Sequence, residues 1–168
     1  MHHRIKYSYM VKVKIQSLEQ TEKAGLFTII FEGESDSEFV KFVEKFKNDA
    51  ERKSELTFIL NQIENMMRRD GFLERNFRPE GKMKDNVVAM PVYRSSLRLY
   101  CLRMSDSVLI VGNGGVKSTR SYEQDEALNG YVISLQKLDA LLRADIRNGV
   151  VRIEKTEIIG VEEKDYEL

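Results

Sequence analysis

Cations are concentrated in the middle of this 168-residue chain. Residues 75–122 contain nine lysines and arginines but three acidic residues, a net charge of +6, whereas the whole chain is neutral, with 27 basic and 27 acidic residues. An arginine side chain can hold two phosphate oxygens at once and stays protonated. Lysine and tyrosine can move protons when neighbouring cations lower their pKa values. This stretch could therefore bind a phosphate group and act on it.

Other chemically active side chains are scarce. The two histidines are His2 and His3, at the start of the chain, where residues are usually poorly ordered. A mechanism that depends on a positioned imidazole, such as a serine–histidine–aspartate triad or a histidine-based ribonuclease, is therefore not expected. The single cysteine, Cys101, excludes a disulfide framework and a thiolate zinc site, and we interpret it as a small buried hydrophobic residue. We expect no metal and no small-molecule cofactor.

Length and composition predict one α+β domain over residues 1–168, with a core over about 26–145 and extensions at 1–25 and 149–168. The apolar fraction of 42% is enough for a hydrophobic core. Because no run of about 18 uncharged apolar residues occurs, we expect no membrane span. Charged residues interrupt the N-terminus, so we expect no signal peptide and a cytoplasmic location.

Hydrophobic spacing in the first half predicts one strand and two helices. Residues 26–31 are β-branched and aromatic, which is typical of a strand. Residues 35–38, Ser-Asp-Ser-Glu, match a capping box, in which a hydroxyl and a glutamate satisfy the first amides of a helix. Apolar residues three, four and seven apart predict this helix and a second one over about 51–69. Residues 72–85 are interpreted as a loop.

The second half predicts an antiparallel meander, a long helix and a last strand. Apolar and more polar residues alternate from Leu97 to Leu102, which indicates a strand with one buried face. The glycine-rich run 112–115 lacks the Gly-Lys-Ser/Thr ending of a phosphate loop, and we interpret it as a turn with positive φ angles. Residues 162–168 are expected to be frayed. The expected elements are strands at 86–92, 96–104 and 108–113, a helix at 122–147 and a strand at 150–159.

Two segments resemble the RelE/HigB superfamily of bacterial toxins, in particular its phage-derived, Gp49-like branch. That family has a strand of the form arginine–hydrophobic–hydrophobic–aromatic, then a strand ending in glycine, a Lys-x-Thr segment and a helix. Here Arg98-Leu99-Tyr100 stands in the arginine strand, and Gly115-Val116-Lys117-Ser118-Thr119 stands in the Lys-x-Thr segment. The resemblance implies a RelE-like fold, with an N-terminal strand, a two-helix hairpin, an antiparallel meander and a C-terminal helix, to which this chain adds a strand.

The resemblance also implies a function. The protein would be the toxin of a type II toxin–antitoxin system, a ribosome-dependent mRNA endoribonuclease that inhibits translation. Its partners would be a cognate antitoxin of the helix-turn-helix type, the ribosome and mRNA. In this interpretation Arg98 and Arg120 contact the phosphate. Lys117 is a second cationic contact or a proton donor, and Tyr122 moves a proton or stacks on a base. The residues expected to bind RNA are Lys82, Lys84, Tyr93 and Arg94.

Each of these residues also has a simpler interpretation. Arg98 could form a structural salt bridge across the sheet, and Lys117 and Arg120 could be solvated loop charges. Tyr100 is better explained by packing than by catalysis.

Two other functions stay open. A catalytically degenerate protein of the same fold could pair with a helix-turn-helix antitoxin or regulator through a groove between the helix pair and the sheet. Exposed side chains at Met66, Met67, Phe72 and Leu73 would favour that function. The chain could also be an unrelated α+β domain, in which case Arg98 would be buried in a salt bridge pointing away from Lys117.

Overall fold

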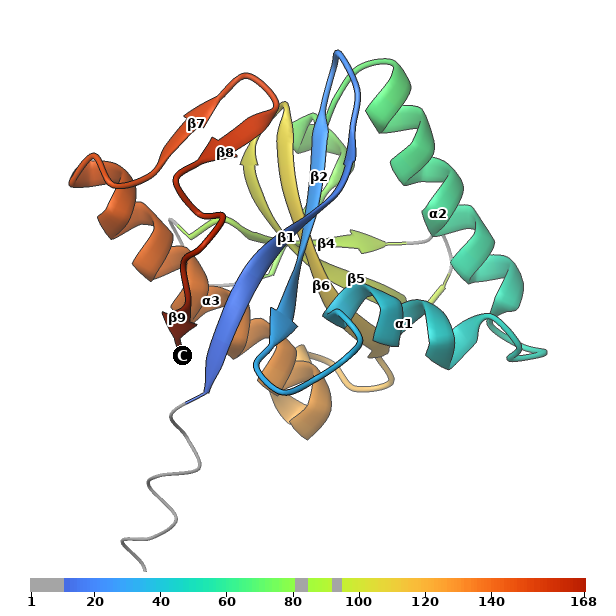
Figure 1. The fold of residues 1–168 in the computed structure, drawn as a ribbon. Coiled ribbons are helices and arrows are strands. Elements are labelled where there is room, and N and C mark those ends of the chain that lie inside the picture. The colour runs from blue at the N-terminus through green and yellow to red at the C-terminus, as the bar shows by residue number, and fades with distance from the viewer. Residues whose placement is uncertain (1–10, 81–84, 92–94) are drawn as a thin grey trace, which may run out of the picture.

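The computed structural model describes residues 11–80, 85–91 and 95–168. Within these residues the fold is α+β, with a seven-stranded sheet between helices on its two faces (Figure 1). The strands of the sheet are β1 (Lys12–Gln20), β2 (Gly25–Phe31), β3 (Arg78–Pro79), β4 (Val87–Pro91), β5 (Leu97–Ser105), β6 (Val108–Val116) and β9 (Tyr166–Glu167). The other elements are α1 (Glu38–Phe46), α2 (Lys53–Arg68), α3 (Glu126–Arg147), the 3-10 turns η2 (Glu74–Asn76) and η3 (Tyr122–Gln124), and a hairpin of β7 (Arg152–Glu154) and β8 (Glu157–Ile159).

The sheet combines a meander with one parallel pair. Its strand order is β3-β4-β5-β6-β2-β1-β9. Strands β4, β5 and β6 are antiparallel neighbours, which confirms the predicted meander. Strands β2 and β6 are parallel and pair only from Gly25–Val108 to Thr28–Val111. Beyond that point β2 continues beside β1, and β6 continues beside β5.

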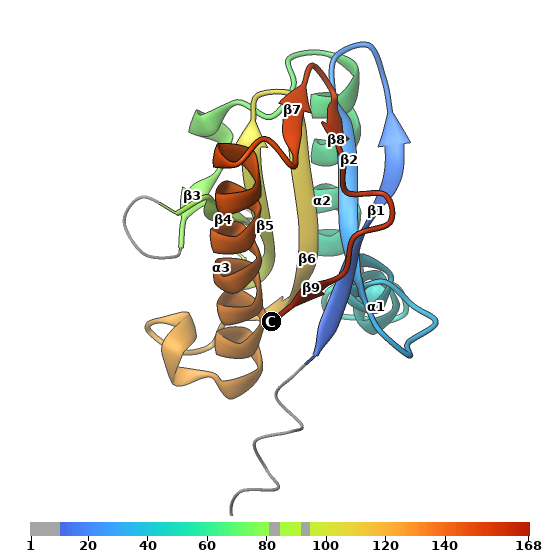
Figure 2. The ribbon, with the colours of Figure 1, turned by 60° about the vertical axis from the view of Figure 1, so that its left-hand side comes forward.

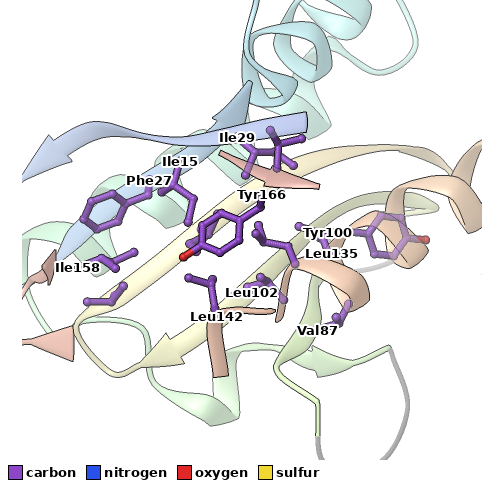
Figure 3. Packing of buried hydrophobic residues seen from close by; sticks show 14 of the residues in the cluster. Ile15, Phe27, Ile29, Val87, Tyr100, Leu102, Leu135, Leu142, Ile158 and Tyr166 are labelled. Atoms are coloured by element: carbon purple, nitrogen blue, oxygen red, sulfur yellow. The ribbon is translucent and has the colours of Figure 1, made fainter. Parts of the chain in front are cut away.

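The two faces of the sheet bury separate cores, because successive side chains of a strand point to opposite faces. Phe27 and Ile110 pack with α3, the β7–β8 hairpin and β9, as Figure 3 shows in part. Leu26 and Leu109 pack with α1 and α2 on the other face. Figure 2 shows α3 and the α1–α2 pair on opposite sides of the sheet. Cys101 is fully buried in the α1–α2 core, which confirms its interpretation as a small buried hydrophobic residue.

Helix α1 begins later than the capping box predicts. Its N-cap is Ser37, whose hydroxyl accepts from the Val40 N–H at 3.2 Å. The Glu38 carboxylate does not reach back to the backbone of Ser35, because it is buried, accepts from the Asn113 side chain and pairs with Lys41. The helix start is thus fixed by tertiary contacts as well as by the local motif.

The glycine run was wrongly interpreted as a turn. Residues 112–115 lie inside strand β6, and none of them has a positive φ. Gly114 is needed because a Cβ there would lie 1.9 Å from the Arg98 carbonyl oxygen, whereas a Cβ on Gly115 would lie 3.2 Å from a methyl group of Leu128, which a small side-chain shift could relieve.

A Gly114→Ala substitution should therefore destabilise the protein by about 1–3 kcal/mol, since a Cβ would overlap backbone that cannot move without breaking the β5–β6 ladder. The matched control is Gly130→Ala in α3, where a Cβ would meet nothing within 4 Å. That control should stabilise the helix by up to about 1 kcal/mol. Urea denaturation measures both, and equal stability of the two variants would contradict the steric explanation.

Both ends of the described chain differ from the prediction. Residues 12–20 were assigned to an extension, but β1 pairs with β2 along its length and buries Val13 and Ile15. The strand expected at 150–159 is instead the β7–β8 hairpin. The tail expected to fray forms β9, which pairs with β1 and buries Tyr166. The core therefore begins before residue 26, the position at which the sequence predicted its start.

Candidate functional site

Arg98 and Lys117 come together at one end of the meander. Arg98 lies opposite Gly115 in the β5–β6 ladder, and the Lys117 N–H extends the contact by donating to the Ser96 carbonyl at 2.7 Å. Because side chains alternate, residues 98, 115 and 117 belong to the α3 face. Both positive charges act on the carboxylate of Glu80. The two predicted cations therefore both lie within electrostatic range of one carboxylate.

Glu80 follows β3, at the edge of the sheet. Its N–H donates to the Val87 carbonyl at 3.2 Å, which holds the residue beside β4. Partial burial raises the pKa of Glu80, although the charges of Lys117, Arg78 and Arg98 oppose that rise. A carboxylate with a raised pKa among cations is suited to accept a proton near neutral pH.

The register across the sheet explains why Arg78 belongs to this group. Arg78 lies opposite Ala89, and Ala89 lies opposite Tyr100. Arg78 on the edge strand β3 is therefore aligned across the sheet with Tyr100 on β5, and Ala89 of β4 lies between them. Sequence reasoning missed Arg78 and Glu80 because it assigned them to a loop. An acid within a strongly basic stretch was the available signal for Glu80.

The Arg98 guanidinium is held through one terminal nitrogen by hydrogen bonds to the backbone. Its Nη1 donates to the carbonyls of Ser95 and Leu97, at 2.8 and 3.0 Å. The Ser95 hydroxyl donates to the Glu55 carboxylate of α2, which also accepts from Arg52 at 3.1 Å. Helix α2 therefore holds Ser95, one of the two residues whose carbonyls bind Arg98. Burial and the nearby Arg78 lower the pKa of Arg98, but a guanidinium stays protonated in proteins.

Two polar atoms at this site lack hydrogen bonds. Within the described residues, Arg98 Nε and the Tyr100 hydroxyl are buried and have no hydrogen-bond partner. Tyr100 is fully buried, and in Figure 3 its hydroxyl points away from the other labelled side chains. Burial raises the pKa of Tyr100, so its hydroxyl keeps its proton. Buried donors without partners are rare in folded proteins and often mark a place for water, an ion or a ligand.

Tyr122 borders the same group, but Arg120 does not. The Tyr122 ring packs edge-to-face on Tyr100, with 6.5 Å between ring centroids, and burial raises the pKa of Tyr122. Arg120 is exposed, and its backbone N–H donates to Gln124 Oε1 at 3.0 Å. Within the described part of the chain, the Arg120 guanidinium is not among the charges that act on Glu80. The predicted RNA-binding residues Lys82, Lys84, Tyr93 and Arg94 lie outside the described residues.

The features that would favour the two alternative functions are not observed. Met66, Met67 and Phe72 are buried in the α1–α2 core, and Leu73 is partly buried. In residues 11–80, 85–91 and 95–168, the Arg98 side chain forms no salt bridge and lies on the side of Lys117.

The described residues contain neither a cluster of metal-ligating side chains nor a membrane-spanning helix. No group of three or more histidine, cysteine, aspartate or glutamate side chains is arranged to hold a metal ion. In the same residues, no helix combines the length and apolar character needed to cross a membrane.

Comparisons with known proteins do not identify the family. No protein-family model, no curated protein and no solved structure matches the chain. The likeness to the RelE/HigB superfamily therefore still depends on the Arg98-Leu99-Tyr100 and Lys117-Ser118-Thr119 segments.

Proposed function

We propose that this protein is a RelE/HigB-like endoribonuclease, the toxin of a type II toxin–antitoxin pair that cleaves mRNA on the ribosome. The proposal combines the two motif segments with the arrangement of charges around Glu80. The observation that carries it is a pair of buried donors, Arg98 Nε and the Tyr100 hydroxyl, which have no hydrogen-bond partner within the described residues, with Arg78 and Lys117 acting on the nearby Glu80. Donors and positive charges of this kind match the oxygens of a phosphodiester.

The chemistry that these residues support is an internal transfer at phosphorus. The Glu80 carboxylate takes the proton of a ribose 2′-hydroxyl, and the 2′-oxygen forms a bond to the adjacent phosphorus. Arg98, assisted by Tyr100, stabilises the negative charge that develops on the phosphate oxygens. The bond from phosphorus to the 5′-oxygen breaks, and Lys117 or Tyr122 donates a proton to that oxygen. The products are a 2′,3′-cyclic phosphate and a 5′-hydroxyl, with no net change in protons.

A reconstituted translation reaction tests this proposal. The purified protein should stop synthesis of a reporter protein and cut its mRNA at defined positions, leaving 5′-hydroxyl ends that primer extension and kinase labelling detect. The same mRNA without ribosomes separates ribosome-dependent cleavage from general ribonuclease activity. Intact mRNA and unchanged synthesis, at protein concentrations equal to those of the ribosomes, would overturn the proposal.

The pH profile of cleavage reports on Glu80. The general base must be deprotonated, so the rate should fall as the pH drops through the pKa of Glu80, which burial raises above the ordinary glutamate value. Glu80→Gln should lower the rate by about 10²- to 10⁴-fold and remove this acidic limb. Single-turnover cleavage rates between pH 4.5 and 8 measure both effects. An unchanged acidic limb in Glu80→Gln would assign the base to another residue.

A further inference from the structure

A cavity lies where the two parallel strands separate, away from the Glu80 group. Strands β2 and β6 stop pairing after Thr28 and Val111, and the following residues of both strands line a cavity of about 520 Å³. We call it the switch-point cavity, and its walls include Phe31, Gly112, Asn113 and Tyr131. This volume lies within the range of small-molecule sites. Its lining residues are different from those around Glu80.

The topology favours a ligand at this position. Helix α1 follows β2 and covers one face of the sheet, whereas α3 follows β6 and covers the other (Figure 2). In sheets with parallel strands, ligands bind in the crevice at the carboxyl ends of two neighbouring strands whose connections leave to opposite sides. The switch-point cavity lies in that crevice, with Glu38 of α1 and Glu126 of α3 contributed by the first residues of the two helices.

Gly130 gives an independent sign that the space is kept open. It lines the cavity from the interior of α3, where glycine is unfavourable for a helix. A Cβ at this position would meet nothing within 4 Å, so no close packing requires the glycine. Because Gly130 is exposed, a larger side chain at this position would stand at the mouth of the cavity. The glycine thus costs the helix stability and leaves room for a ligand.

The walls suit a flat ring with an uncharged amino group. Phe31 and Tyr131 supply aromatic surface, and the polar lining includes Asn113 and Ser134 as well as the carboxylates of Glu38 and Glu126. Asn113 donates to one Glu38 oxygen. The other oxygen is buried and contacts the Lys41 ammonium at 2.9 Å, but it has no aligned hydrogen bond within the described residues. Lys45 donates to the Tyr131 hydroxyl at 3.1 Å. Lys41 offsets the charge of Glu38, whereas Glu126, at the exposed rim, forms no ion pair within the described residues. The cavity therefore offers carboxylate acceptors to an uncharged donor.

We propose that the switch-point cavity binds a nucleobase with an exocyclic amino group, such as adenine, guanine or cytosine, stacked against its aromatic wall. The base could belong to a free nucleotide or to a strand of RNA. This inference does not depend on the proposed nuclease activity, because the cavity and the Glu80 group share no residues.

Isothermal titration calorimetry of the full chain with adenosine, guanosine, cytidine and uridine tests the proposal. At least one of the three amino nucleosides should bind with a Kd below about 1 mM. Uridine should bind at least about tenfold more weakly, because it offers no amino donor to the carboxylates of Glu38, which is buried, and Glu126, which is exposed. No binding of any amino nucleoside up to about 5 mM, or equal binding of uridine, would overturn the proposal.

Variants locate the binding in the cavity. Gly130→Leu should obstruct the mouth of the cavity and weaken nucleoside binding at least about tenfold while the thermal midpoint is retained or raised, since leucine favours a helix. Glu126→Gln, an exposed position, is the second variant if Gly130→Leu does not fold, and it should weaken binding about threefold to tenfold. Wild-type affinity in the folded cavity variant would overturn the assignment. Tighter binding of the 5′-monophosphate points to a free nucleotide, and tighter binding of a trinucleotide points to RNA.

Discussion

Replacing Arg98 with alanine is expected to lower the single-turnover rate of mRNA cleavage by about 10²- to 10³-fold, the usual cost of removing one group that stabilises developing negative charge. The effect should be large because two backbone carbonyls already fix the guanidinium, and its free Nε has no other partner within the described residues. No reorganisation is then needed when the phosphate arrives. Cleavage of a labelled mRNA on purified ribosomes measures the rate.

Two variants separate this role from a merely structural one. Arg98→Lys keeps a positive charge but loses the planar fork, so it should recover only part of the rate. Arg120→Ala removes an exposed arginine that does not act on Glu80, and it should change the rate by less than about threefold. A full rate in Arg98→Ala, or equal losses in Arg98→Ala and Arg120→Ala with unchanged folding by circular dichroism, would contradict the assignment of the phosphate contact to Arg98.

The elements that were predicted correctly are those with strong local signals. The strand at 26–31 and the helices at 38–46 and 53–68 have apolar spacings that only one kind of secondary structure satisfies. The meander was also predictable, because Ser105-Asp106-Ser107 leaves a short connection between two apolar runs. Consecutive antiparallel strands then had to place Arg98 beside the end of β6, which explains why Arg98 and Lys117 were found together.

The elements that were missed depend on contacts between distant residues. Strand β1 alternates Lys12, Val13, Lys14 and Ile15, and this period of two was an available signal that was not used. Strand β9 has two residues and exists because β1 offers a free edge about 150 positions earlier. No local pattern in such a short and acidic segment could have predicted it.

Only part of the candidate site could be predicted from the sequence, because the rest of it also depends on contacts between distant residues. Arg98 lies in β5 and Lys117 directly follows the neighbouring β6, whereas Arg78 and Glu80 reach them through β3, a two-residue edge strand that Glu80 follows. Burial of Glu80, and the missing partners of Arg98 Nε and Tyr100, are properties of the packed molecule. The residue types indicated phosphate chemistry, but the carboxylate and the unpartnered hydroxyl needed the tertiary structure.

Tyr166→Ala is expected to lower the free energy of unfolding by about 3–5 kcal/mol, a value typical of a large aromatic side chain removed from a core. Tyr166 is 4% exposed and packs in the α3-side core, where its hydroxyl donates to Asp145 of α3 at 2.8 Å. The substitution would leave a void between β1 and α3. It would also remove a donor from a carboxylate that Lys164 contacts at 3.2 Å.

The neighbouring Glu167→Ala is the matched control, since its side chain is exposed and its backbone pairing with Lys12 is unaffected by the substitution. It should change stability by less than about 0.5 kcal/mol. Urea denaturation followed by circular dichroism measures both variants. If residues 162–168 were frayed, both substitutions would have the same small effect on stability. Equal stabilities of the two variants would therefore contradict the packing of β9 on the core. A loss confined to Tyr166→Ala would instead make β9 part of the folded core, because only a docked strand can transmit the removal of one ring to the whole domain.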